Sequence, residues 1–253
     1  MADDFRPCLV VPVYNHGQAL PATLASLASA RLHCIVVDDG SDADCAAVID
    51  ALARKLDWIE TIRLPENRGK GGAMKVALAH AARAGYSHVL QIDADGQHDA
   101  DDVPAFIAAA RRDPRAVVVG AARFDASAPR ARRWARHLTH FWVHVNTLSL
   151  DIADALCGFR VYPLAATVAL LDREHLGDRM DFDIEILVRL HWSGVRCCNV
   201  PTHVRYPADG VSHFRLLRDN ALISRMHARC FFGMLLRAPR LVARRIRSAT
   251  AAA

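Results

Sequence analysis

The sequence contains no charge-free apolar run of the roughly 18–20 residues that a membrane-spanning helix requires. It also has no basic N-terminal segment followed by an apolar stretch, so we expect neither a transmembrane helix nor a secretory signal. Its seven cysteines include no C-x-x-C pair, and most lie in apolar segments. We therefore interpret them as reduced core residues of a cytosolic protein and expect no structural zinc site.

Two common nucleotide-binding motifs are missing as well. No G-x-G-x-x-G follows the first apolar segment, and no glycine-rich loop has the spacing of a P-loop. These absences count against a dinucleotide-dependent oxidoreductase and a P-loop nucleotide hydrolase. Hydrophobic residues make up 52% and charged residues 23% of the 253 residues, which suits a soluble α/β domain rather than a disordered chain.

The net charge of +5 is concentrated at the C-terminal end of the chain. Residues 213–253 carry nine arginines and a single acid, Asp219, whereas the preceding residues are slightly acidic overall. This distribution favours an anionic surface as partner and does not favour nucleic acid. From residue 216 onward, leucines and phenylalanines alternate with the arginines, which predicts a basic amphipathic helix interrupted at Pro239.

Two interpretations of this C-terminal helix stay open. It can lie on an anionic membrane, where a lipid substrate would be found, or it can pack on the domain with its arginines in water. In both cases we divide the chain into a domain of residues 1–215 and a helical tail of residues 216–253.

Short apolar segments alternate with helical patterns through the first half of the chain. Strands are expected at residues 8–13, 33–37, 58–64, 88–92 and 116–120. Helices are expected at residues 18–30, 46–56, 73–84 and 101–111, and later at 130–151 and 182–192. A further strand, residues 195–204, is interrupted by Pro201. The alternation predicts an α/β fold, a Rossmann-like and mostly parallel sheet with helices on both faces.

Two carboxylates follow the fourth expected strand, at Asp93 and Asp95. The carboxyl ends of parallel strands are where ligands bind in such sheets, and carboxylates are preferred ligands of hard divalent cations. Gln97 offers a further oxygen, and a substrate diphosphate could complete the shell. The alternative is an ordinary turn or helix-capping cluster, since Asp and Gly are common turn residues.

Two more loops leave neighbouring strands with binding chemistry. Asp38 and Asp39 could accept hydrogen bonds from a base or a ribose, or could cap the next helix. Arg68 and Lys70 stand in a glycine-rich loop before a helix, which is a favourable environment for phosphate, although either can be a solvated cation.

Four segments in this order resemble glycosyltransferase family 2. They are residues 11–15 (Val-Pro-Val-Tyr-Asn), 37–41 (Val-Asp-Asp-Gly-Ser), 67–71 (Asn-Arg-Gly-Lys-Gly) and 93–98 (Asp-Ala-Asp-Gly-Gln-His). Within that family, the chain is most similar to the polyprenyl-phosphate sugar synthases, the dolichol-phosphate mannosyltransferase-like branch. The resemblance implies a GT-A fold, a nucleotide-diphosphate sugar donor, Mg²⁺ or Mn²⁺, and inversion at the anomeric carbon. It also implies that Pro12, Tyr14 and Asn15 belong to the donor site.

The resemblance continues further along the chain. Residues 120–123 are similar to the family's glycine-x-arginine stretch near the acceptor, and residues 154–160 to its segment ending in Gly-Phe-Arg. Residues 200–205 and 210–212, with Ser212, resemble a loop that closes over the substrates. Asn199 and His213 depart from the pattern, because that branch commonly has Glu and Lys at these positions.

The chemistry depends on the acceptor. A hydroxyl acceptor needs a general base, for which Asp181 and Asp183 are the candidates, with Glu185 next. Their alternative role is capping of the helix that follows. A phosphate acceptor is already anionic and needs no base, so arginines would hold it instead. The arginines considered for this role are Arg123, Arg136 and Arg160.

We therefore expect an inverting, metal-dependent transferase that acts on a lipid-linked acceptor at the cytoplasmic face of the membrane. The open alternatives are a transferase for a soluble hydroxyl acceptor and a nucleotide-sugar-binding protein without turnover. A nucleotidyltransferase is disfavoured, because its N-terminal glycine-rich signature is missing.

Overall fold

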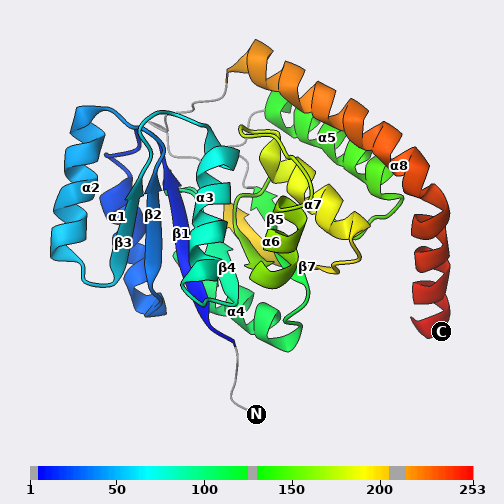
Figure 1. The fold of residues 1–253 in the computed structure, drawn as a ribbon, viewed down its shortest axis with the longest axis horizontal. Helices are drawn as coiled ribbons and strands as arrows, with labels where there is room; N and C mark the ends of the chain where they lie inside the picture. The colour runs from blue at the N-terminus through cyan, green and yellow to red at the C-terminus, as the bar shows by residue number, and fades with distance from the viewer. Residues whose placement is uncertain (1–4, 125–129, 205–214, 253) are drawn as a thin grey trace.

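The structure is a computed structural model that describes residues 5–124, 130–204 and 215–252. Within these residues, seven strands form one sheet in the order β3-β2-β1-β4-β6-β5-β7 (Figure 1). The strands are β1 (Pro7–Val13), β2 (Cys34–Asp38), β3 (Ile59–Arg63), β4 (His88–Gln91), β5 (Val117–Phe124), β6 (Arg160–Pro163) and β7 (Cys197–Val204). Only β6 is antiparallel to its neighbours, so the prediction of a mostly parallel sheet is confirmed for the described residues.

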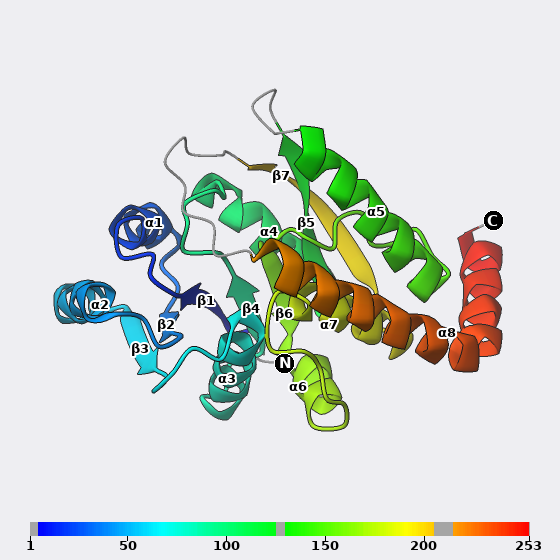
Figure 2. The same cartoon turned by 90° about the horizontal axis from the view of Figure 1, so that it is seen from above.

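Helices cover both faces of the sheet (Figures 1 and 2). They are α1 (Leu20–Leu27), α2 (Ala43–Lys55), α3 (Lys70–Arg83), α4 (Val103–Arg112), α5 (Arg130–Thr147), α6 (Leu164–Leu171), α7 (Phe182–Trp192) and α8 (Leu216–Ala252), with short 3₁₀ turns η1 (Ala28–Ala30) and η2 (Ala100–Asp102). One core cluster contains side chains of α3, α6 and α7, and a second contains side chains of α1, α2 and α4.

The central strand β1 shows why the sequence gives this arrangement. Cys8 and Val10 lie in one core cluster, and Leu9 and Val11 lie in the other. Successive side chains of a strand point to opposite faces, so a strand covered on both faces must be apolar throughout. The continuous apolar run that predicted a buried parallel strand is confirmed.

For three of the elements that differ from the sequence expectation, the structure shows the reason. Helix α3 begins at Lys70 rather than at residue 73, because Gly71 and Gly72 are required by close packing and do not end the helix. A Cβ on Gly71 would lie 2.4 Å from the Cβ of Phe182. Helix α6 was not expected, since its apolar residues follow directly on β6 and show little periodicity. The interruption expected at Pro201 is wrong: β7 continues through it, and β7 is the edge strand of the sheet, where proline is tolerated.

Helix α8 runs alongside α5 and then turns away from it (Figures 1 and 2). Met226 and Cys230 are fully buried in the core cluster that contains α7. The predicted interruption at Pro239 is wrong, because the helix continues past this residue. No helix in the described part of the chain is both long and apolar enough to cross a membrane. The division into a domain and a tail stays a prediction.

Candidate active site

The candidate site lies where the parallel strands β1, β2 and β4 end together. Val13 pairs with Asp38 at the end of β1 and β2, and Asp93 follows β4 by two residues. The polar segments that the sequence singled out therefore leave the same edge of the sheet, as parallel pairing requires. Pro12 lies within β1, and Tyr14 and Asn15 come directly after it.

Asp39 organises the loop before α3. Its Oδ1 accepts a hydrogen bond from the Arg68 N–H (2.8 Å), and its Oδ2 accepts from the Gly69 N–H (2.8 Å) and the Asn67 amide (3.0 Å). Burial raises the pKa of Asp39, and the N–H groups of Arg68 and Gly69 oppose that rise. Gly69 has φ +88°, and a Cβ there would lie 2.5 Å from the carbonyl oxygen of Asp178. The loop is therefore fixed before any ligand arrives.

Asp38 also has protein partners, since it accepts from the Ser41 N–H (2.9 Å) and from Arg63 Nε (2.8 Å). The side chain that caps α2 is Asp42, which accepts from the Cys45 N–H (2.9 Å). Asn15 adopts φ +54° and accepts from the Asp42 N–H (2.9 Å). Capping by Asp38 or Asp39 is therefore wrong, whereas their contact with a base or ribose stays a prediction.

Lys70 lies at the centre of the site, between two carboxylates from different elements. Its Nζ is 2.8 Å from Asp93 Oδ1 and 2.7 Å from Asp183 Oδ2. Burial alone would lower the pKa of Lys70, but the charges of Asp183 and Asp93 raise it well above its ordinary value. Burial likewise opposes ionisation of Asp93, yet Lys70 and His98 hold its pKa below its usual range. Lys70 and Asp93 are therefore both charged at neutral pH.

The turn that follows β4 carries both Asp93 and Asp95. Asp95 Oδ1 accepts from the Gln97 N–H (3.1 Å) around Gly96, whose φ is +70°. Burial and the nearby charge of Asp93 raise the pKa of Asp95. Both oxygens of Asp93 contact the Lys70 ammonium, Oδ1 at 2.8 Å and Oδ2 at 3.0 Å. In the described part of the chain, no three His, Cys, Asp or Glu side chains form a ready-made metal cluster.

The two candidate bases occupy different places. Asp183, in the first turn of α7, is one of the two carboxylates that contact Lys70. We call Lys70, Asp93 and Asp183 the Lys70 group. Asp181 stands at the N-cap of α7 without a side-chain capping bond, so the capping role is wrong for it. Its Oδ1 accepts from the Arg179 N–H (3.3 Å), and burial raises its pKa. Glu185 is fully buried and accepts from Arg189 and Arg229.

The prediction that Arg160 holds the acceptor is wrong for the described structure. Its side chain is fully buried, and it donates to the carbonyl oxygens of Cys157 (2.7 Å), Ala155 (2.8 Å) and Asp183 (2.6 Å). Its Nη1 also lies 3.7 Å from Asp183 Oδ1. No surface remains for a ligand, so Arg160 positions Asp183.

Arg123 and Arg136 remain as acceptor candidates. Arg123 is exposed near the end of β5, and Arg136 on α5 pairs with the buried Asp154. Asp154 also accepts from His140 Nε2 (3.3 Å) and from the Leu156 N–H (2.9 Å). Burial would raise the pKa of Asp154, but His140 and Arg136 lower it to about 2. Ser212 lies outside the described residues, as does His213.

With this geometry in view, comparison with known proteins gives the family. Residues 8–177 match the model described as Glycosyl transferase family 2. The chain belongs to glycosyltransferase family 2. It is a glycosyltransferase.

Several family members with curated names are similar over most of this chain. An undecaprenyl-phosphate mannosyltransferase of Micrococcus luteus is 25% identical over 203 residues, covering 78% of this chain and 82% of the relative. A dolichyl-phosphate beta-glucosyltransferase of Drosophila melanogaster is 28% identical over 202 residues, covering 71% of this chain but only 60% of the relative. A polyprenol monophosphomannose synthase of Mycolicibacterium smegmatis is 27% identical, covering 62% of this chain and 61% of the relative. These relatives belong to the branch that the motifs resembled, which confirms that prediction.

Solved structures of glycosyltransferases confirm the fold. Glucosyl-3-phosphoglycerate synthase from Mycobacterium tuberculosis, in complex with Mn²⁺, uridine diphosphate and glucosyl-3-phosphoglycerate, matches 91% of this chain and 80% of its own with a TM-score of 0.67. Because the identity is only 16%, this likeness supports the GT-A fold alone.

Two residues of this glycosyltransferase site were missed from the sequence as individual contributors. Asp154 was considered only as part of a family segment. Its carboxylate joins α5 to the loop before β6, because it pairs with Arg136 and accepts from the Leu156 N–H. Gly158 lies so close to Asp93 that a Cβ there would be 2.1 Å from Asp93 Oδ2. The only available signal for either residue was its place in the segment that ends in Gly-Phe-Arg.

Proposed function

We propose that this glycosyltransferase moves a sugar from a nucleotide-diphosphate donor to a polyprenyl phosphate, with inversion at the anomeric carbon. The observation that carries the proposal is the contact of Lys70 with Asp93 and Asp183 beside the loop that Asp39 holds. These groups lie at the carboxyl ends of parallel strands, where α/β sheets bind ligands. The names of the similar proteins support a lipid phosphate as acceptor.

The donor diphosphate would lie near the N-terminus of α3. Helix N-termini favour anions, and Arg68 precedes this helix with its backbone fixed by Asp39. Pro12, Tyr14 and Asn15 would contribute the adjoining wall of the donor site, with Asp38 facing the nucleoside. The nucleotide base and the sugar stay open.

Mg²⁺ or Mn²⁺ would be held by Asp93 and Asp95, with Gln97 as a further oxygen ligand. The residues fit such an ion, because one turn carries two carboxylates and a carboxamide, whose oxygens are the ligands that hard cations prefer. Diphosphate oxygens would complete the shell, since hard cations take several oxygen ligands. When bound, the ion would stabilise the negative charge of the departing diphosphate.

Lys70 keeps the two acids in fixed positions during this reaction. The raised pKa of Lys70 keeps its ammonium charged beside both carboxylates, and this charge holds the pKa of Asp93 below its usual range despite burial. Asp93 thereby faces the donor as a carboxylate. Arg160, which donates to the Asp183 carbonyl oxygen, holds the start of α7 in place.

The role of Asp183 depends on the acceptor. A phosphate acceptor attacks as an anion, and Arg123 and Arg136 would orient it. The alternative acceptor, a soluble hydroxyl, is favoured by one observation, namely that the Asp183 carboxylate belongs to the Lys70 group. In that case Asp183 would accept the hydroxyl proton as general base.

Contact with an anionic membrane is the second part of the proposal. Helix α8 buries one face in the core, but Leu217 and Leu236 on it are 87% and 85% exposed, between exposed arginines. Apolar side chains next to basic ones favour the surface of an anionic bilayer. The enzyme would therefore be cytoplasmic and peripheral at the inner face of the membrane.

The test is the release of nucleoside diphosphate from a panel of UDP-, GDP- and dTDP-sugars, with Mn²⁺ or EDTA, and with or without a polyprenyl phosphate. We expect release from one donor that requires both the metal and the lipid phosphate. Release without lipid but with a soluble alcohol would favour the hydroxyl acceptor. Tight donor binding without release under any condition would favour a nucleotide-sugar-binding protein.

A further inference from the structure

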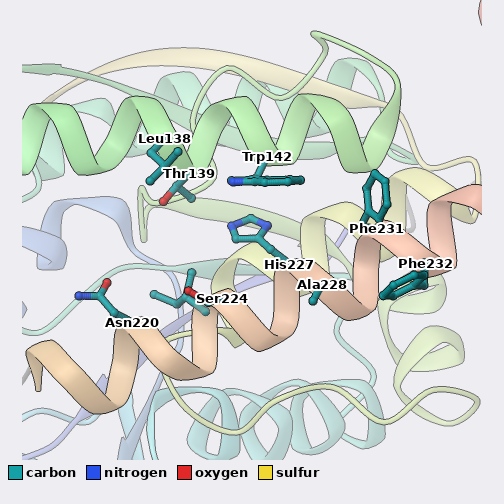
Figure 3. A pocket seen from close by; sticks show the side chains of 10 residues that line it. Leu138, Thr139, Trp142, Asn220, Ser224, His227, Ala228, Phe231 and Phe232 are labelled. Atoms are coloured by element: carbon teal, nitrogen blue, oxygen red, sulfur yellow. The ribbon is translucent and has the colours of Figure 1, made fainter.

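A pocket of about 440 Å³ lies between α5 and α8, and its lining includes none of the residues of the Lys70 group. It is lined by Leu138, Thr139, Trp142, Asn220, Ile223, Ser224, His227, Ala228, Phe231 and Phe232 (Figure 3). We call it the α5–α8 pocket. Its volume falls in the range of roughly 300–1,000 Å³ that is usual for small-molecule sites.

The lining of the α5–α8 pocket changes character along its length. Figure 3 shows Asn220, Ser224 and Thr139 toward one end, Trp142 above His227 in the middle, and Phe231 and Phe232 at the other end. One end thus offers hydroxyl and amide groups, and the other offers aromatic rings. A ligand that matches this lining is amphiphilic, with a polar head and an apolar chain.

One buried polar group lacks a partner in this pocket. His227 is only 7% exposed, and its Nε2 has no hydrogen-bond partner among the residues that the structure describes. Its Nδ1 lies 3.2 Å from Asn146 Nδ2, which donates to it, so the neutral ring carries its proton on Nε2. Burial lowers the pKa of His227 to about 4, which keeps the ring neutral. A buried donor without a partner is unfavourable, and a ligand oxygen would satisfy it.

The polar and apolar ends of the pocket identify the kind of ligand. Asn220 and Thr139 at the polar end offer an amide and a hydroxyl, which hydrogen-bond to anionic oxygens. Phe232 at the other end is 67% exposed and is followed by exposed Leu235 and Leu236. The hydrogen-bonding groups at the polar end suit a phosphate head, and the apolar end suits a hydrocarbon chain.

We propose that the α5–α8 pocket binds the isoprenoid units next to the phosphate of the acceptor lipid, with the phosphate toward Asn220. This inference rests on the proposed function and names the site that recognises the lipid chain. The chain would run along Trp142 and Phe231 and leave past Phe232 toward the exposed leucines of α8. Affinity for the acceptor would then increase with the number of isoprene units that fit in the pocket.

The variant Ala228→Trp tests this inference, because Ala228 is an exposed residue of the pocket wall and an indole there would fill the space. Ala243→Trp is the matched control, since it lies on the exposed surface of the same helix outside the pocket. Both are assayed without membranes, using prenyl monophosphates of one to four isoprene units. For the wild type, the acceptor KM should fall at least tenfold along this series.

Ala228→Trp should lose this chain-length dependence, while its donor KM and the behaviour of Ala243→Trp stay as in the wild type. Phe232→Ser, which removes an exposed wall of the pocket, should raise KM severalfold for the longest chain only. Unchanged chain-length dependence in both pocket variants would overturn the inference, as would equal effects of the two tryptophans.

Calorimetric binding of the four-unit prenyl phosphate, measured without donor, separates this inference from the proposed function. Binding that Ala228→Trp abolishes, without transfer by the wild type, would support the pocket and contradict the proposed acceptor. Transfer with the same KM for every chain length would support the acceptor and overturn the pocket.

Discussion

At the scale of single residues, the structure separates two acids that the sequence treated as equals. Asp183 lies 2.7 Å from Lys70, whereas Asp181 accepts from the backbone of Arg179. Substitution by Asn keeps the size of each side chain and removes its charge, so the pair Asp183→Asn and Asp181→Asn forms a matched comparison. The difference between them reports on the Lys70 group.

We expect Asp183→Asn to lower kcat at least 100-fold and Asp181→Asn to lower it less than tenfold. In the first variant Lys70 loses one of its two carboxylate partners, and the site loses the negative charge of Asp183. Nucleoside diphosphate release at saturating donor measures both, with thermal melting as the control for folding. Equal losses would contradict the separate roles of the two acids.

The sequence predicted which residues gather at the site better than it predicted what each one does. Asp39 directly follows β2 and Lys70 contacts Asp93 after β4. Asp39, however, uses its hydrogen bonds to hold the loop at residues 67–69. Arg160 was expected to contact a ligand, but its side chain is fully buried and donates hydrogen bonds to backbone carbonyl oxygens. A motif fixes the position of a side chain along the chain, but its hydrogen-bond partners come from segments folded against it.

At the scale of helices and strands, Asp154 is the link between α5 and the sheet. It accepts from Arg136 and His140 of α5 and from the Ala122 N–H of β5 (3.2 Å). Its pKa, lowered to about 2 from 3.8, corresponds to about 2 kcal/mol of folding free energy. Because the folded pKa lies below the unfolded one, this contribution is complete above about pH 4 and is lost as the pH falls toward 2.

Asp154→Asn should therefore lower the free energy of unfolding by about 2 kcal/mol at neutral pH. The difference from the wild type should shrink between about pH 4 and pH 2, where the native carboxylate becomes protonated. Urea denaturation at several pH values measures this. Asp57→Asn, at an exposed position, should show neither effect; a pH-independent difference for Asp154→Asn would contradict the electrostatic explanation.

Helix α8 provides a second prediction at this scale. The double variant Leu217→Ser and Leu236→Ser should weaken binding to anionic vesicles at least tenfold, since two leucines lost from apolar contact correspond to about 2–3 kcal/mol. Co-sedimentation with phosphatidylglycerol vesicles measures it. Point variants are preferable to removing the helix, because Met226 and Cys230 lie in the core. Leu150→Ser, exposed outside α8, is the control, and equal loss for it would count against α8 as the contact.

Elements were predictable where burial dictates a pattern. The strands β2 and β4 are buried along their whole length, and β1 is buried except at Pro7 and Pro12. Their apolar runs identified them. Helix α6 was not predictable, because its nearly continuous apolar run shows little periodicity. The start of α3 was not predictable either, because its glycines are required by close packing against residues 178–182. The packing partners of these glycines are far away in the sequence, so no local periodic pattern indicates them.

At the scale of the whole molecule, α8 is joined to the catalytic side by a buried charge. Glu185 of α7 is fully buried, and its Oε2 accepts from Arg229 of α8 (2.9 Å) and from the Gly177 N–H (3.0 Å). The neighbouring Asp178 contacts α3, since its carbonyl oxygen accepts from the Gly72 N–H (2.9 Å). A chain of contacts therefore runs from α8 through α7 and residues 177–178 to the start of α3.

Arg229→Leu should lower the free energy of unfolding by about 1 kcal/mol, because Glu185 loses one charged donor but keeps Arg189. Arg225→Leu removes the same charge from an exposed position of the same helix and should change it by less than about 0.5 kcal/mol. Urea denaturation compares the two. If α8 unfolds together with the domain, Arg229→Leu will shift one single transition. A separate early transition, or equal effects of both variants, would show that α8 is a tail whose stability is independent of the site.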